Sequence, residues 1–445
     1  MPLRVAKTSS QLRSLRIVQV SPAYAPLVGG AERMLQSVSE RLVERGHDVS
    51  VLTFDCAALP DFDSPRGAGL TPSETINGVR VTRVGPASPR FQRWHQWWLK
   101  QRGGWRTSAW LFSDNVWPLR PPSGLGLVLP LARMKADVVV SANWHFGMSY
   151  WVCRPRHLRS TPRVAFPILH IEREWAHNPI YPRMFRDCDG VIVCTEAERD
   201  FVRARGGHTI AVSGAGVDPG HFIRRDGAAI RARYGIGDRA VVGFVGRQDT
   251  NKGVPTLIEA MRNVWRRFPD SVLLLAGQSA HRGERVSEML DELTEENRAR
   301  VVLIDDFDQR DAASIMDACD LLVLPSVEES FGLVMIEAWM CGKPVIGADI
   351  ASTRCIIDHG VDGWTAKPFD ATDLADRILD LLADPAKRAG FGERGRTKVL
   401  SRYTWDRVTD VWESALRRAA RRSHNRAPAS HERQRIPASM KGEVS

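Results

Sequence analysis

The stretch "PSVEESFGLVMIEAW", residues 325–339, joins a loop that holds two neighbouring acids to a helix that is apolar almost all round. A helix of that composition is expected to be buried. Glu337 nevertheless lies in its middle, and a glutamate is almost never fully buried unless a partner compensates its charge. A second carboxylate, Glu329, stands eight residues earlier. The two acids therefore raise the question of which ligand or cation they face.

The run "DLLVLP" that leads into this stretch is one of many short apolar runs that alternate with amphipathic helical runs. One series begins at "LRIVQV" (15–20) and a second at "RAVVGFVG" (239–246), with the Gly- and Pro-rich "GAGVDPGHF" (214–222) between them. Such alternation predicts parallel sheets covered by helices. We therefore predict an α/β fold of two doubly wound, Rossmann-like parallel-sheet domains. They face a cleft, where ligands of such sheets bind at the carboxyl ends of strands.

The chain ends differ in composition from the body between them. Residues 1–16 carry a net charge of +4 and residues 417–445 a net charge of +6, which together equal the excess of +10. A neutral body argues against nucleic acid as a partner, and the polar, charged ends are typical of disorder. The predicted parts are a disordered basic extension (1–14), a first domain (15–218), a second domain (219–400), a C-terminal helix (401–420) and a disordered basic tail (421–445).

Two general features limit where the protein works. No apolar run reaches the roughly 18 residues that a membrane-spanning helix needs. The seven cysteines are irregularly spaced, with no Cys-x-x-Cys pair and no cluster with histidines. We therefore expect free thiols in a reducing cytoplasm rather than a disulfide framework or a zinc site.

A candidate anion site lies in "VVGFVGRQDTNKGVPTLIEA", residues 241–260. A buried strand ends at Gly246, Arg247 follows it, and Lys252 precedes a helix that begins near Val254. Arginine binds phosphate through two N–H groups and lysine binds it as a point charge, while the amides of a helix N-terminus add to both. The alternative is a surface turn with two solvated cations.

The opening stretch offers a matching site. Gly332 would let a ligand approach the backbone closely, and the free amides of the helix's first turn favour a phosphate. Glu337 is one turn deeper, where a carboxylate can bind the hydroxyls of a ribose. The alternative for Glu337 is a buried ion pair with a distant arginine or lysine, and Glu329 taken alone would be a plain loop glutamate.

The first domain repeats the arrangement of a strand, glycines and a helix. In "SPAYAPLVGGAERM" (21–34), Gly29 and Gly30 open a helix directly after the first strand. The spacing is not G-x-G-x-x-G, so nothing here supports a dehydrogenase nucleotide site. One anion site in each domain, facing one cleft, suits a diphosphate-linked ligand.

These motifs together resemble the GT-B, family-4-type retaining glycosyltransferases (glycosyl transferases group 1), over about residues 15–415. They are "GGAER", "GAGVD", "GR…KG" and "PS-x-x-E-S-F-G-L-V-x-x-E-A", whose acids match the family's E-x7-E pair. The resemblance implies an acceptor-binding first domain and a nucleotide-sugar-binding second domain. It also implies a C-terminal helix that crosses back to the first domain.

The resemblance also implies roles for the site residues. Arg247 and Lys252 would hold the donor diphosphate and stabilise its charge as it leaves. Glu337 would bind the donor ribose, and Glu329 would contact the transferred sugar near its reacting face. The remaining donor-binding residues would approach mainly through the backbone: Gly29, Gly30, Gly246, Phe331, Gly332 and Leu333. No cofactor is expected, and the nucleotide-diphosphate sugar is a co-substrate.

The family places a histidine at the end of a first-domain strand, near the reacting centre. His145 and His170 are the candidates, and the position after the later strand favours His170 as the catalytic one. The chain also departs from the family. It has Arg354-Cys355 where a Pro-Glu pair is usual and "AGQSA" where a G-x-G is usual. Both places can touch the donor's base or sugar, so the identity of the donor stays open.

No metal is predicted. Asp187 with Asp189, and Asp306 with Asp308, have the D-x-D spacing that binds metal and nucleotide in a different glycosyltransferase fold. The first pair simply precedes the strand "GVIVC", and the second lies in a loop at a strand end.

Residues 90–112, "RFQRWHQWWLKQRGGWRTSAWLF", contain five tryptophans and five cations but no acid. Basic aromatic helices are typical of membrane interfaces, because tryptophan favours the headgroup zone and cations favour anionic lipids. The alternative is a lid whose tryptophans pack on the cleft or stack on sugars. The residues that we predict to bind acceptor or membrane are Arg93, Trp94, Trp97, Trp98 and Lys100.

The sequence therefore predicts a retaining, metal-independent hexosyltransferase in the cytoplasm, peripheral on the inner face of the membrane. It would move a sugar from a UDP- or GDP-linked donor to a lipid-linked, polysaccharide or glycolipid acceptor. One alternative is a nucleotide-sugar epimerase or hydrolase, which would turn over donor without acceptor. Another is a silent nucleotide-sugar-binding scaffold, against which the joint presence of the four charged site residues argues.

Overall fold

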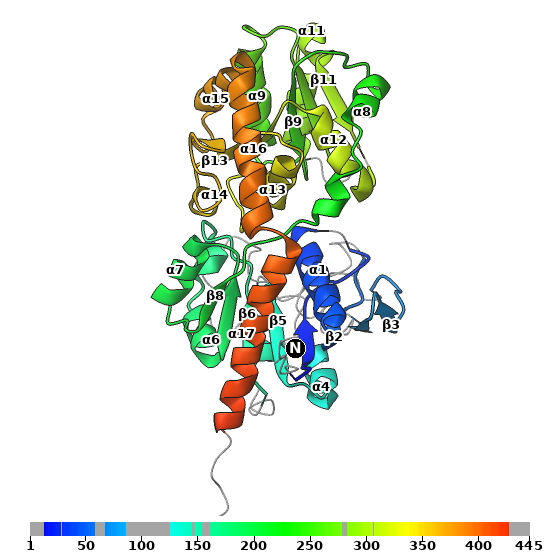
Figure 1. The fold of residues 1–445 in the computed structure, drawn as a ribbon, viewed down its shortest axis with the longest axis vertical. Helices are drawn as coiled ribbons and strands as arrows, with labels where there is room; N and C mark the ends of the chain where they lie inside the picture. Colours follow the sequence, from blue (N-terminus) through cyan, green and yellow to red (C-terminus); the bar gives the residue numbers. More distant parts are fainter. Residues whose placement is uncertain are drawn as a thin grey trace, which may run out of the picture.

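The computed structural model describes most of the chain, and the α/β fold with two parallel sheets is confirmed. The two sheet domains are stacked along the long axis of the molecule, joined near its waist (Figure 1). The described residues are 13–27, 29–57, 67–85, 125–144, 147–153, 161–277, 283–305 and 307–426.

The first sheet has eight strands in the order β3-β4-β2-β1-β5-β6-β7-β8. All its pairings are parallel except β3 with β4. That hairpin turns through Asn77 and Gly78, whose φ angles of 47° and 81° suit the Asn-Gly pair. The strands are β1 (Arg16–Val20), β2 (Asp48–Phe54), β3 (Ser73–Ile76), β4 (Val79–Val84), β5 (Val138–Ala142), β6 (Arg163–Phe166), β7 (Gly190–Val193) and β8 (Ile210–Val212).

Helix α1 (Gly30–Glu44) shows why the helices of this domain cover the sheet. It buries Met34, Leu35, Val38 and Leu42, which recur at helical spacing on one face. The other helices described in this domain are α4 (Leu125–Arg133), α5 (Met148–Cys153), α6 (Tyr181–Asp187) and α7 (Glu196–Ala204), with a 3₁₀ turn η5 (Glu174–His177).

The second sheet has six strands in the order β11-β10-β9-β12-β13-β14, all parallel. The strands are β9 (Val241–Val245), β10 (Val272–Ala276), β11 (Val301–Ile304), β12 (Leu321–Leu324), β13 (Val345–Ala348) and β14 (Gly363–Ala366). Its helices are α8 (Gly227–Arg233), α9 (Val254–Val264), α10 (Glu284–Asp291), α11 (Glu295–Arg298), α12 (Ala312–Ala318), α13 (Leu333–Met340), α14 (Ala351–Arg354), α15 (Ala371–Ala383) and α16 (Pro385–Arg402), with 3₁₀ turns η6 (Pro219–Phe222) and η8 (Gln309–Asp311).

The last helix, α17 (Trp405–Arg426), runs from the second domain along the first (Figure 1). Trp412 is fully buried there and meets Phe166 of β6 edge to face, with ring centroids 4.7 Å apart. At the crossing point the N–H of Val217 donates to Tyr403 O at 2.8 Å, and the N–H of Trp405 donates to Val217 O at 3.1 Å. The two chain segments that connect the domains, one containing Val217 and the other Tyr403 to Trp405, are therefore hydrogen-bonded to each other.

The helix boundaries differ from those predicted. We expected one helix over 401–420, but α16 continues to Arg402 and α17 runs from Trp405 to Arg426. Thr404 separates the two helices because it forms an isolated bridge with Val217. Residues 421–426, which we assigned to the tail, therefore belong to the helix. No helix in the described part of the chain is both long and apolar enough to cross a membrane.

Candidate functional site

Helix α13 begins directly at the edge where β12 ends. Gly332 precedes it in the left-handed region, with φ of 83°. A Cβ at Gly332 would come within 2.7 Å of the flexible end of Met335 and 3.1 Å of Leu324, so the positive φ, rather than space alone, is what favours glycine there. The predicted approach of a ligand to the backbone at this turn stays a prediction.

Glu337 is buried in α13 and forms an ion pair with Arg33 of α1, on the first domain. The guanidinium donates to Oε1 of the carboxylate. This is the buried ion pair that the sequence left open as the alternative for Glu337. Arg33 was not identified from the sequence, because it lies 304 residues away along the chain. The ribose-binding role of Glu337 remains a proposal.

Glu329 forms a second ion pair, within the second domain. Lys252 Nζ lies 2.5 Å from Glu329 Oε1, and the carboxylate is buried. Burial alone would raise the pKa of Glu329, but the Lys252 ammonium, with smaller effects from His170 and Ser326, brings the pKa below its ordinary value. Glu329 is therefore a charged carboxylate at neutral pH. Glu329 and Lys252, which the sequence placed in separate motifs, meet at one point.

The loop that carries Lys252 is fixed against the loop that carries Glu329. The Lys252 N–H donates to Asp249 Oδ1 at 2.9 Å. Gly253 has a φ of 74°, and a Cβ there would collide with the carbonyl of Pro325. The glycine of "KG" thus permits contact between two backbones, and this contact seats the Lys252 ammonium over Glu329.

Arg247 follows β9 and Gly246 at the same sheet edge. Half of its side chain is exposed, and its guanidinium lies 3.5 Å from Asp249. An ion pair at this distance and exposure contributes little energy. Arg247 is therefore available to an incoming anion at small cost.

His170 comes from the first domain, after β6, and faces this cluster. Burial lowers the pKa of His170 from 6.5 to about 4; Lys252, Arg173 and Arg247 add to the lowering, and Glu329 opposes it. His170 is therefore neutral at pH 7, with no charge to repel a cation or attract a phosphate. Its neighbours in the second domain include three of the four charged residues predicted from the sequence.

The backbone before His170 is held in an unusual conformation. Ile168 has a φ of 53°, which is rare for a β-branched residue and is typical of constrained functional loops. The next N–H, of Leu169, donates to Glu198 Oε1 at 2.8 Å, and the N–H of Cys194 donates to Oε2. Burial raises the pKa of Glu198 to about 8. Sequence reasoning missed Glu198 because its position on α7 looks like an ordinary helix surface.

The glycines before α1 meet the second domain, but their helix N-terminus is occupied by a side chain. A Cβ at Gly30 would lie 3.7 Å from Leu333 Cδ1 of α13. The carboxylate of Glu32 folds over the first turn, where a Cβ at Gly29 would collide with it. Burial raises the pKa of Glu32, and its own N–H opposes this. The first domain therefore presents Arg33, rather than bare helix amides, as its positive group.

Phe331 has a packing role that the sequence did not indicate. Its side chain is buried and meets Tyr403 edge to face, with centroids 5.3 Å apart. A Cβ at Gly214 would lie 3.6 Å from its ring. The ring therefore packs where the two domains join, which leaves only its backbone to serve a ligand.

A further ion pair crosses between the domains beside the site. Arg173, three residues after His170, lies 2.5 Å from Glu328, the neighbour of Glu329. The pair joins the loop of the predicted catalytic histidine to the loop of the predicted sugar-binding acid. Neither partner was singled out from the sequence, since each looks like a solvated loop charge.

We expect charge exchange at this pair to show that it aligns the two loops. Arg173→Glu and Glu328→Arg should each lower kcat/KM for donor turnover about fivefold, since a partly exposed pair contributes roughly 1 kcal/mol. The double exchange should recover most of that loss. Nucleotide release, measured in a double-mutant cycle, checks this. Additive losses in the double variant would show that the pair does not align the loops.

The lowered pKa of His170 also predicts a pH dependence of stability. Between pH 4 and 6.5 the folded protein holds fewer protons at this residue than the unfolded chain does. Acidification through that window therefore removes stability. His170→Asn should lose less free energy of unfolding than the wild type between pH 7 and pH 4.5, measured by urea unfolding. His221→Asn, at an exposed histidine, is the matched control, and equal slopes in all three proteins would contradict the assignment.

Several predicted residues lie outside the described part of the chain. They are His145, Asp306 and all five candidates in the tryptophan-rich segment: Arg93, Trp94, Trp97, Trp98 and Lys100. Asp189 accepts a hydrogen bond from the Arg163 N–H at 2.9 Å, and Asp308 pairs with Arg310 at 2.7 Å. Within the residues that the structure describes, no group of three or more His, Cys, Asp or Glu side chains is placed to hold a metal ion.

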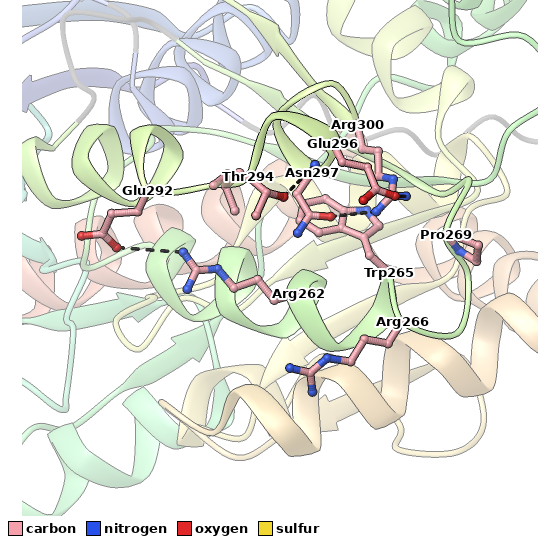
Figure 2. Close-up of a pocket in the computed structure, with 10 residues that line it drawn as sticks. Arg262, Trp265, Arg266, Pro269, Glu292, Thr294, Glu296, Asn297 and Arg300 are labelled. Atoms are coloured by element: carbon pink, nitrogen blue, oxygen red, sulfur yellow. Dashed lines mark hydrogen bonds and ion pairs between the residues drawn. The ribbon is translucent and has the colours of Figure 1, made fainter.

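One cavity, of about 440 Å³, lies on the second domain away from these residues (Figure 2). Two of its three lining arginines are paired with its own acids: Arg300 with Glu296 at 2.5 Å, and Arg262 with Glu292 at 3.9 Å. No candidate site residue lines it. We assign it no part in the site.

Comparison with known proteins agrees with the two-domain arrangement. Residues 29–214 match the family model described as glycosyl transferase 4-like domain, and residues 226–398 match that described as glycosyl transferases group 1. A D-inositol 3-phosphate glycosyltransferase of Stackebrandtia nassauensis is 27% identical over 93% of this chain and 95% of its own length. A glycogen synthase of Mycobacterium tuberculosis is 25% identical over 93% of this chain and 98% of its own.

Solved structures show the same fold. A sucrose-phosphate synthase of Thermosynechococcus elongatus has a TM-score of 0.70 at 22% identity, covering 91% of this chain and 98% of its own. HepE of Anabaena, solved in complex with UDP and glucose, has a TM-score of 0.69 at 20% identity, covering 91% and 99%. The predicted GT-B fold is thereby confirmed.

Proposed function

Because the chain belongs to the GT-B, family-4-type glycosyltransferases, we propose that it transfers a hexose from a nucleotide-diphosphate sugar with retention of configuration and without a metal ion. The observation that carries this proposal is the cluster formed across the two domains. It joins neutral His170 of the first domain to the Lys252–Glu329 pair and Arg247 of the second. Within the described chain, this is where predicted charged residues of the second domain and a predicted catalytic residue of the first come together.

The donor diphosphate would lie against the first turn of α13. The first amides of α13 follow β12, and Lys252 and Arg247 follow β9, the strand paired with β12. These charges stabilise the diphosphate more as it departs than while it is bound to the sugar, which lowers the barrier to transfer. Glu337, one turn deeper in α13, would accept the ribose hydroxyls.

The sugar would lie between Glu329 and His170. Glu329 is a carboxylate that accepts hydrogen bonds from sugar hydroxyls. His170 is neutral, so it can orient a hydroxyl without placing a positive charge beside the reacting carbon. The departing phosphate would accept the acceptor's proton on the same face of the sugar, and transfer from that face retains configuration. This scheme needs neither a metal nor a second protein base.

The acceptor side is proposed from the sequence. The tryptophan-rich segment 90–112 carries five cations and no acid, which suits an anionic membrane and a lipid-linked or glycan acceptor. We expect the protein to cosediment with anionic vesicles at low salt, and Trp97→Ala/Trp98→Ala to reduce the bound fraction severalfold. A chain ending at Arg426 tests whether the basic tail causes the same adhesion. Unchanged vesicle binding by the tryptophan variant would remove the membrane role of this segment.

Turnover of nucleotide sugars tests the function itself. UDP-glucose is the first donor to try, because HepE of Anabaena, which shares the fold, was solved with UDP-glucose; GDP- and ADP-linked sugars follow. Nucleotide release should continue in excess EDTA and rise when a glycan or glycolipid acceptor is added. The anomeric configuration of the product, read by NMR, should equal that of the donor. Complete loss of release in EDTA, or inversion, would contradict the proposal.

A further inference from the structure

We propose that Arg33 is a donor-binding residue that exchanges partners: it holds Glu337 when no donor is bound and moves to the donor diphosphate when the ribose takes its place. This inference rests on the proposed function and adds a residue that the sequence motifs did not assign. The observation behind it is the ion pair between α1 of the first domain and α13 of the second.

Arg33 and a ribose would compete for the same carboxylate. The guanidinium donates to Oε1 of Glu337, and the carboxylate is only 7% exposed at its side chain. A buried carboxylate that lost its cation without replacement would cost several kcal/mol. Two ribose hydroxyls can replace the guanidinium N–H as hydrogen-bond donors. Hydrogen bonds from the ribose therefore offset the free-energy cost of releasing Arg33 from Glu337.

The released cation has a destination within reach. Glu337 is one helical turn, about 5.4 Å, from the first amides of α13, where the diphosphate is expected. The side chain of Arg33 is 30% exposed, so part of it borders solvent rather than the protein interior. An arginine that turns through this distance can bind phosphate oxygens through two N–H groups.

The charges already in the second domain leave room for a further cation. Lys252 is compensated by Glu329 at 2.5 Å, so Arg247, only weakly paired with Asp249 at 3.5 Å, is the more available of these two cations. A nucleoside diphosphate brings at least two negative charges. Arg173 of the first domain is paired with Glu328, whereas Arg33 would be released by the ribose itself, so we expect Arg33 to meet the diphosphate.

The exchange predicts different effects for a nucleoside and its diphosphate. In Arg33→Gln the competitor for Glu337 is gone, so both ligands gain the same factor, between one and about ten. The nucleoside diphosphate also lacks one phosphate contact, so its affinity relative to that of the nucleoside should fall about tenfold, the usual loss for one charge-assisted hydrogen bond. Arg33→Lys keeps the positive charge but lacks the two parallel N–H groups of the guanidinium. Its affinities should therefore lie between those of wild type and Arg33→Gln.

Calorimetric titration of both ligands into full-length wild type, Arg33→Gln and Arg33→Lys tests this, with uridine and UDP, or the pair whose base wild type prefers. Arg41→Gln is the matched control, because Arg41 lies on α1 and reaches Asp218 at 3.5 Å without contacting α13. Its two affinities should not change. Thermal melts confirm that each variant is folded, and Arg33→Lys carries the test if the glutamine variant is not.

A fall in the affinity for the diphosphate relative to that for the nucleoside, with nucleoside binding unchanged or tighter, supports the exchange. Equal weakening of both ligands would mean that Arg33 only sets the geometry of the domains, and unchanged affinities would mean that Arg33 never meets the phosphates; either result overturns the inference while leaving the proposed function intact. If wild type binds no nucleoside diphosphate, the proposed function fails, and the exchange fails with it.

Discussion

Lys252→Met will weaken nucleoside diphosphate binding by about a hundredfold or more. The variant loses a charge-assisted contact to the diphosphate, which contributes roughly 1.5–3 kcal/mol. It also leaves the buried carboxylate of Glu329 without its cation, 2.5 Å from where the ammonium stood, so that an uncompensated negative charge faces the phosphates. Isothermal calorimetry measures the change.

A second lysine of the same domain provides the control for this prediction. Lys387 pairs with Asp380 at 2.7 Å, outside the site. Lys387→Met should leave nucleotide affinity within twofold of wild type. If the two methionine variants bind equally well, the diphosphate does not contact Lys252, and the anion site assigned to "GR…KG" is wrong.

Glu329→Gln will lower kcat by about a hundredfold without weakening nucleoside diphosphate binding. Glutamine keeps the shape but loses the charge that opposes developing positive charge at the sugar, an effect of the size seen when one transition-state contact is removed. Lys252, no longer held by a carboxylate, becomes more available to the phosphates, so the affinity for the diphosphate should rise. Steady-state donor turnover and calorimetry together measure this split.

Asp380, the partner of Lys387, provides the matched control for Glu329. Asp380→Asn removes a carboxylate from a lysine ion pair in the second domain, and neither kcat nor affinity should change. A parallel loss of kcat and affinity in Glu329→Gln would indicate that Glu329 only supports Lys252. In that case the carboxylate would have no contact with the transferred sugar.

The fold, and the part of the site that lies in the second domain, could be predicted from local sequence. The apolar runs that become β9 and β12, buried along their whole length, signal parallel strands. Residues placed at the ends of such strands must gather at one edge, which is why Arg247, Lys252 and Glu329 could be expected together. The proximity of these three residues depends only on the order of strands and loops within one domain.

The contacts between domains could not be read in the same way. Arg33 pairs with Glu337 and Arg173 with Glu328, and each pair joins loops or helices of separate sheets. No periodicity or spacing relates residues so far apart, because the angle between the domains decides which charges face each other. The burial of Glu337 predicted, as one alternative, a distant cationic partner, but it could not identify which residue that partner is.

The roles of individual glycines also could not be predicted from the sequence alone. "GG" at the start of α1 predicted an anion site, which stays a prediction, and the carboxylate of Glu32 lies beside that helix end. Gly253 could be read only as part of a motif, whereas its contact with the Pro325 carbonyl explains why no side chain fits. In both places a neighbour decides the role of the glycine, and that neighbour is visible only in three dimensions.

A crystal structure with bound nucleoside diphosphate shows directly whether the donor site lies between the two domains. We expect the diphosphate within hydrogen-bond distance of Lys252, Arg247 and the first amides of α13, with the ribose hydroxyls on Glu337. A nucleotide bound elsewhere, for example in the outer cavity of Figure 2, or in the cleft without contact to these residues, would contradict the account.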